Sequence, residues 1–159
     1  MRHAPRSLFL VSASLATAVA VTASCGSTLL EQRIERSAGG RTAALTKLRD
    51  GPNAYERGNN VRNVPAAGTR FLWAWITLRN DGRSPQVFNY DRCDLDDGGS
   101  RVLPGLVDRA TFVNLPLMDT TDQLDPGEKL ERRLIFSYPW DRFPTRLACG
   151  DVVIPLPKF

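Results

Sequence analysis

The sequence contains a single histidine, His3, and none in the 156 residues after it. Histidine is the side chain most used for proton transfer near neutral pH and for binding zinc or copper. Its absence from the rest of the chain excludes Ser-His and Cys-His nucleophiles there. Carboxylate chemistry and a Ser-Lys pair stay open, although no motif brings two such groups together. We therefore expect no enzymatic activity, no catalytic residue and no cofactor.

The sequence also lacks any run of lysine or arginine. Its formal net charge is +4, but Arg2 and Arg6 lie in the first 24 residues and no acidic residue precedes Glu31. The remaining chain has 19 basic and 17 acidic residues, interleaved along its length. Nucleic-acid binding normally requires a basic patch or stripe. We expect no nucleic-acid partner.

One apolar run, from Leu8 to Val21, is long enough to consider as a membrane segment. It follows the basic stretch 1–6 and precedes small residues, which is the order found in export signals. The run is short, and its Ser and Thr residues weaken it as a membrane span, so an uncleaved anchor is the least favoured alternative. We predict a signal peptide over residues 1–24.

The stretch Thr22-Ala23-Ser24-Cys25-Gly26 resembles the lipobox of bacterial lipoproteins. That resemblance implies that the Cys25 thiol is diacylated and becomes the new N-terminus, and two acyl chains would hold the protein stably on a bilayer. Thr22 departs from the pattern, which usually has an aliphatic residue there. Cleavage after Ala23 is the alternative and would give a secreted soluble protein. We expect a lipid-anchored, extracytoplasmic protein of the cell envelope.

Cysteine is scarce, with three residues in the chain. An odd thiol is unusual in an exported protein, but lipidation of Cys25 would leave Cys93 and Cys149 as a pair. The oxidising compartment permits a bond between them. Closing this loop of about 56 residues would stabilise the fold by roughly 4 kcal/mol. Two separately buried thiols are the alternative.

The stretch from Phe71 to Arg79, closed by the turn residues 80–82, predicts a central strand because it is apolar on both faces. We expect its aromatic face to lie under a second sheet, with the aliphatic face covered by other segments. The alternative is an aromatic stripe that stacks on a sugar ring or grips a partner. The two faces carry Leu72, Ala74, Ile76 and Leu78 on one side, and Phe71, Trp73, Trp75 and Thr77 on the other.

The rest of the chain predicts a single all-β domain over residues 41–159, after a flexible tether over residues 25–40. Residues 26–40 contain few apolar side chains and end in a glycine pair. The polar run that ends at Gly68 is expected to be a long loop, and residues 106–117 to be irregular. Arg132 shares a strand face with core residues, so we expect it to be paired or at an edge. Short strands between Gly, Pro, Asn and Asp turns are typical of a β-sandwich, and they are expected at Thr42–Arg49, 86–90, 101–104, 129–138 and 147–154. For Thr42–Arg49 a helix is the alternative, because its Ala and Lys residues suit a helix equally.

Three motifs at turns and strand boundaries resemble those of a known family. Gly68 precedes a strand that ends at Asn80, residues 94–98 form a polar hairpin, and Leu124-Asp125-Pro126-Gly127-Glu128 leads into the strand that contains Phe136. This pattern is similar to the extracytoplasmic immunoglobulin-like domain of unknown function in bacterial lipoproteins, whose fold also occurs in small secreted mycobacterial immunoprotective antigens. The resemblance covers residues 41–159 and implies an immunoglobulin-like antiparallel β-sandwich. It carries over no catalytic residues. The two tryptophans and the cysteine pair depart from the usual pattern.

The hairpin at residues 94–99 combines carboxylates with glycines. Asp94, Asp96 and Asp97 could supply oxygen ligands to Ca²⁺, but the alternating ligands and distal glutamate of an EF-hand are absent. We prefer the interpretation that Asp and Gly residues here satisfy the geometry of a turn, and we expect no metal.

Trp140 and Phe143 lie in a segment between two strands, where we expect Trp140 to be exposed. With Trp73 and Trp75 they are the candidate partner-binding residues. The sequence thus favours a non-catalytic binding or accessory module, attached to the membrane through its N-terminal lipid, with an unidentified envelope protein or glycan as partner. A structural or antigen-like surface protein is the first alternative. A carboxylate-dependent glycan hydrolase is the second, and it would need two carboxylates that face each other across a groove.

Overall fold

A computed structural model of the chain describes residues 26–57, 61–109 and 120–159. The predicted signal peptide and the lipidation site Cys25 lie outside the described residues. Apart from a 3₁₀ turn, η1 (Tyr90–Arg92), the regular elements of the described residues are β-strands. All their pairings are antiparallel.

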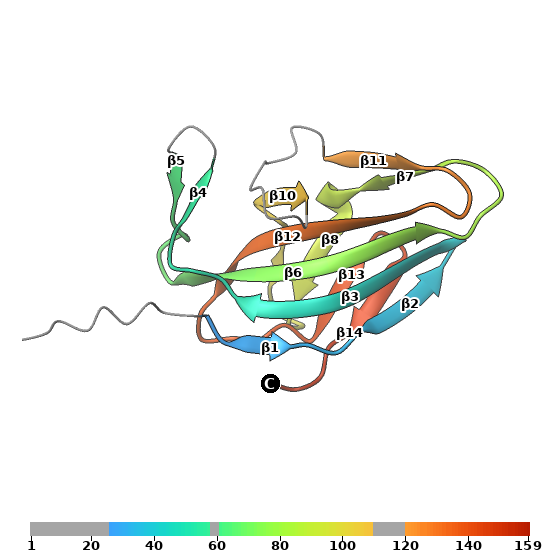
Figure 1. The fold of residues 1–159 in the computed structure, drawn as a ribbon. Helices are drawn as coiled ribbons and strands as arrows, with labels where there is room; N and C mark the ends of the chain where they lie inside the picture. Colours follow the sequence, from blue (N-terminus) through green and yellow to red (C-terminus); the bar gives the residue numbers. More distant parts are fainter. Residues whose placement is uncertain (1–25, 58–60, 110–119) are drawn as a thin grey trace, which may run out of the picture.

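The larger sheet has the order β1-β3-β6-β12-β10, and β2 also pairs with β3. It forms the front layer in Figure 1. The predicted strand at residues 42–49 is confirmed as part of β3, and the predicted central strand as β6, which pairs with β3 on one side and β12 on the other. The strands of this sheet are β1 (Thr28–Leu30), β2 (Ile34–Ala38), β3 (Arg41–Asp50), β6 (Thr69–Asn80), β10 (Leu106–Arg109) and β12 (Lys129–Pro139).

The second layer has the order β14-β13-β8-β9 and lies behind the first in Figure 1. Two further antiparallel pairs, β7 with β11 and β4 with β5, complete the described strands. The bounds are β4 (Tyr55–Arg57), β5 (Val61–Asn63), β7 (Gln86–Asn89), β8 (Cys93–Asp96), β9 (Arg101–Val102), β11 (Thr121–Leu124), β13 (Arg146–Cys149) and β14 (Val152–Pro155).

The main core fills the space between the two layers. Leu72 and Ile76 of β6 pack in one cluster with Leu95 of β8, Leu147 of β13 and Ile154 of β14, each at most 1% exposed. Burial of this apolar surface is the principal stabilising contribution to such a fold. The prediction of an all-β antiparallel sandwich is confirmed.

The orientation expected for β6 is wrong. Its aliphatic row faces the core between the sheets, whereas Trp73 and Trp75 lie half-buried on the outer face. The slim side chains Leu72 and Ala74, both 0% exposed, pack closely against the second sheet. The aromatic face is covered instead by Tyr55 of the β4–β5 hairpin and by Arg133 of β12.

The prediction of a flexible tether before residue 41 is also wrong. Residues 28–30 and 34–38 form β1 and β2, which pair with β3. Leu30 is 6% exposed and joins the main core. An edge strand can form backbone hydrogen bonds with its neighbour even when it has few apolar residues. The small number of apolar residues in this segment therefore did not indicate a tether. Strands also occur in the two segments expected to be irregular: β4 and β5 before Gly68, and β10 at its residues Leu106–Arg109.

Candidate functional site

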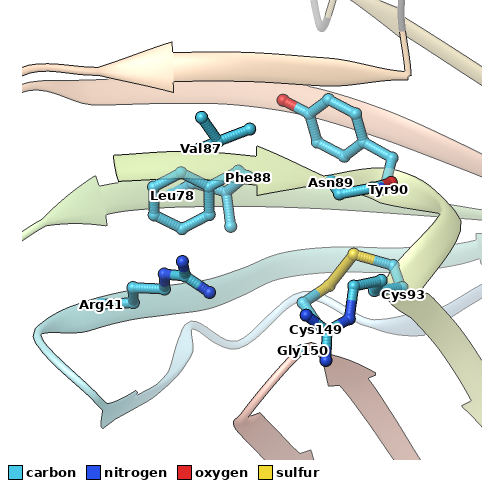
Figure 2. Close-up of a pocket in the computed structure, with 10 residues that line it drawn as sticks. Arg41, Leu78, Val87, Phe88, Asn89, Tyr90, Cys93, Cys149 and Gly150 are labelled. Carbon is cyan, nitrogen blue, oxygen red and sulfur yellow. A yellow bond between two sulfur atoms is a disulfide. The ribbon is translucent and has the colours of Figure 1, made fainter. Parts of the chain in front are cut away.

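The predicted disulfide is confirmed. Cys93 of β8 and Cys149 of β13 are register partners and are bonded to each other, across 56 residues of sequence. Figure 2 shows the bond beside a small cavity below Phe88 and Tyr90. The cavity of about 50 Å³ has room for water but is small for an organic ligand.

Two polar groups beside this cavity, the Arg41 guanidinium and the Tyr90 hydroxyl, have partners. Arg41 donates from Nε to Gln86 at 2.7 Å and lies over the Phe88 ring. The Tyr90 hydroxyl donates to the Asp122 carboxylate. Burial and this carboxylate raise the pKa of Tyr90. These contacts join β3 to β7 and η1 to β11 beside the disulfide, which itself joins β8 to β13 within one sheet.

The carboxylates of the candidate calcium hairpin serve its turn. Asp96 accepts a hydrogen bond from the backbone N–H of Gly98, and Asp97 accepts from Gly99 at 2.8 Å and from Ser100 at 2.6 Å. These donors lower the pKa of both carboxyls, with help from Arg146 at Asp96 and from Arg142 at Asp97. Gly98 has φ 91°, a conformation that glycine adopts without strain.

Asp94 is buried, and its carboxylate accepts from Arg101 at 2.7 Å. The interpretation that Asp and Gly residues here satisfy the geometry of a turn is confirmed for Asp96, Asp97 and Gly98, whereas Asp94 lies within β8. Within the described residues, no three His, Cys, Asp or Glu side chains gather in a way that could hold a metal ion.

An aromatic row lies on the outer face of the larger sheet, and we call it the outer aromatic cluster: Tyr55, Phe71, Trp73 and Trp75. The Tyr55 ring meets Phe71 and Trp73 edge-on, with centroids 5.2 and 6.0 Å apart. Trp73 and Trp75 lie 5.9 Å apart. Pairs in this geometry contribute about 0.5–1.5 kcal/mol beyond burial. The structure therefore brings together the two tryptophans singled out in the sequence, with two aromatic neighbours.

A buried ion pair lies against this cluster. Arg133 of β12 binds the Asp108 carboxylate of β10 through Nε, at 3.0 Å, and through Nη2. Its guanidinium also lies 4.3 Å from the Trp73 ring centroid. Burial raises the pKa of the Asp108 carboxyl, and Arg133 opposes that rise. The pair lies against one side of the outer face, and the Arg133 guanidinium covers a ring face of Trp73.

A cavity of about 120 Å³ opens between the β4–β5 hairpin and the larger sheet, and we call it the outer-face cavity. Its walls are mainly apolar, and Phe71, Leu106 and Ile135 form a second buried cluster there. Polar groups come from Asn63 and Ser137. Small-molecule and side-chain sites typically combine apolar walls with a few polar groups in this way. The full lining is Tyr55, Asn63, Val64, Phe71, Gly105, Leu106, Ile135 and Ser137.

Trp140 and Phe143 lie elsewhere, at the end of the sandwich where β12 finishes. The prediction that Trp140 is exposed is confirmed, since 68% of its surface is accessible, and Phe143 is 41% exposed. The four candidate aromatic residues thus divide between two surfaces, the outer face of β6 and this end.

No family model, curated protein or solved structure matches the chain. The family resemblance drawn from the motifs therefore stays a prediction. In the part of the chain that the structure describes, no helix has the length and apolar character needed to cross a membrane.

Sequence reasoning missed Asp108, Arg133 and Tyr55. Arg133 alternates with the core-facing Leu134, so period 2 places it on the outer face, but no pattern pairs it with a residue of β10. Arg132, on the opposite face, was expected to be paired, and this is confirmed: it donates to the Asp122 carboxylate at 2.9 and 2.8 Å.

Proposed function

We propose that the protein is an exported, lipid-anchored, non-catalytic binding or accessory module of the bacterial cell envelope. The observation that carries this proposal is the Cys93–Cys149 disulfide. Structural disulfides form and persist in oxidising compartments outside the cytoplasm. The bond also leaves Cys25 as the one remaining thiol of the sequence, within the lipobox-like motif that follows the export signal. The motif resemblance to immunoglobulin-like lipoprotein domains agrees with this proposal.

The outer-face cavity is the surface proposed to bind the envelope partner. Its mainly apolar walls suit an apolar side chain of a protein or one face of a sugar ring. Neither this cavity nor the one beside the disulfide is lined by a carboxylate. Glycoside hydrolysis needs a pair of them, so these two cavities support binding rather than the hydrolase alternative.

Site-specific photo-crosslinking in living cells tests the binding surface. A photoreactive residue at Val64, which lines the cavity and is 63% exposed, is expected to capture one envelope component. The matched control is Val153 on β14, which is also exposed, at 45%, but lies in the other layer. The crosslinked species would be identified by mass spectrometry.

Capture at Val64 but not at Val153 would support the binding module. Absence of adducts at Val64 would contradict it and favour the structural or antigen-like alternative. Equal adducts at both positions would indicate contact without a specific surface, and would also remove the cavity as the binding site.

A further inference from the structure

Three exposed aromatic residues lie at one end of the sandwich. We call them the tip cluster: Trp140, Phe143 and Phe159. Trp140 has the largest exposed fraction among the large hydrophobic side chains of the described residues, 68%. Phe143 and Phe159 are 41% and 39% exposed, and their ring centroids lie 5.9 Å apart. Exposed aromatic residues that gather in one place mark an interaction surface more often than isolated ones do.

The tip cluster is held in place by the sandwich. The Arg70 guanidinium lies 4.6 Å from the Phe143 ring centroid and donates to the Arg142 carbonyl at 3.1 Å. The backbone N–H of Trp140 donates to the Gly68 carbonyl at 3.3 Å. The tip cluster is thus presented by the beginning of β6 and the end of β12.

The same end of the sandwich receives the N-terminal segment. Asp50, at the end of β3, accepts a hydrogen bond from the Ser27 hydroxyl at 2.6 Å, and its other oxygen lies 3.2 Å from Arg70 Nη1. Arg70 in turn covers Phe143. Figure 1 shows β1 beginning at the left, where β6 also begins.

Ser27, which is held at this end of the sandwich through Asp50, lies two residues after the predicted lipidation site Cys25. Consecutive Cα atoms are about 3.8 Å apart, so two residues span less than about 8 Å. Acyl chains on the Cys25 thiol would enter the bilayer within a short distance of Trp140 and Phe143. A lipid anchor at this point would place the tip cluster, and not the opposite end of the sandwich, at the membrane surface.

The charges around the tip cluster are balanced. Arg70 is paired with Asp50, and Arg142 lies 3.5 Å from Asp97. Lys158 and Asp141 carry opposite charges, are both exposed, and adjoin Phe159 and Trp140 in the sequence. Balanced charge gives little attraction to anionic headgroups, whereas Trp residues favour the interfacial zone of a bilayer through their amphipathic rings.

We propose that the tip cluster is a membrane-contact surface, which lies in the bilayer interface beside the acylated Cys25 and fixes the orientation of the sandwich. This inference rests on the proposed lipid anchor. Trp140 enters the interfacial zone first, with Phe143 and Phe159 beside it. The outer-face cavity on β6 and β12 is then held at a defined angle to the membrane and stays accessible to a partner.

Quenching of tryptophan fluorescence by brominated lipid tests the orientation. The full chain, purified from membranes, is reconstituted in vesicles of phosphatidylethanolamine and phosphatidylglycerol with brominated acyl chains, and flotation of the vesicles measures anchoring separately. We expect quenching in the native protein, loss of quenching in Trp140→Phe, and unchanged quenching in the matched variant Trp75→Phe. Because the surface is charge-balanced, the quenching should persist at high salt.

The results distinguish failure of the tip surface from failure of the lipid anchor. Protein that floats without quenching of Trp140 overturns the tip surface and keeps the lipid anchor. Quenching that is lost in Trp75→Phe instead would place the outer face on the bilayer and also overturn it. Protein without acyl chains that still floats, and stops floating in Trp140→Phe, keeps the tip surface and removes the anchor. Protein that neither floats nor is quenched removes both.

Discussion

Replacing Cys93 and Cys149 together by alanine is expected to lower the free energy of unfolding by about 4 kcal/mol. The bond closes a loop across 56 residues, so its loss returns conformational freedom mainly to the unfolded chain. A small domain has a total stability of about 5–15 kcal/mol, so this is a large part of it. Urea unfolding of the native and variant proteins measures the difference.

The control is chemical reduction. A thiol reductant should bring the native protein to the stability of the double variant and should not change the variant itself. A native protein whose urea midpoint is the same with and without reductant would contradict the view that this bond stabilises the sandwich.

Replacing Asp108 by alanine is expected to cost about 3 kcal/mol of unfolding free energy at neutral pH. Asp108 is 1% exposed and Arg133 is 8% exposed, and the substitution leaves a buried guanidinium without its carboxylate. The same change loosens the contact of Arg133 with the Trp73 ring, so the near-ultraviolet circular dichroism of the tryptophans should weaken as well. Chemical denaturation measures the stability.

Two variants sharpen this test. Glu31→Ala removes the exposed partner of Lys47 and should cost less than about 1 kcal/mol, because surface ion pairs contribute little. The double variant Asp108→Leu with Arg133→Met should recover most of the loss, because it leaves no buried charge unpaired. If Asp108→Ala cost no more than Glu31→Ala, the buried pair would not be a structural determinant of the outer face.

Sequence patterns predicted the features that depend on local chemistry. The continuous apolar character of residues 71–79, closed by turn residues, predicted β6, and the turn residues around Gly98 predicted a hairpin. The exposure of Trp140 followed from its place in the segment between two predicted strands. In each case the signal lies within a few neighbouring residues, so a single stretch of chain was sufficient.

Features that depend on distant segments were not predictable. Both faces of β6 are apolar, so alternation alone does not indicate which one meets the second sheet. The Asp108–Arg133 pair joins β10 to β12 across 25 residues, and no periodicity connects them. The strands β1 and β2 form because the side of β3 that does not pair with β6 can hydrogen-bond to them. The composition of residues 26–40 does not show that this edge is present.

The separation of the four candidate aromatic residues has a similar cause. The sequence places Trp73 on a strand and Trp140 in a loop, but it does not show which distant segments cover either ring. Their different surroundings come from packing: Arg133 and Tyr55 cover Trp73, whereas nothing in the described residues covers most of Trp140. Burial of an aromatic ring is therefore a property of the assembled sheet.

The intact mass of the protein purified from its native membrane fraction, before and after reduction with alkylation, tests the central proposal most directly. The proposed function predicts a chain that begins at Cys25, carries acyl chains, and gains two alkylated thiols only after reduction. A lipid-free mass that begins at Ser24 would contradict the anchor. In that case the protein would be secreted and soluble, with a free thiol at Cys25 available for covalent dimerisation.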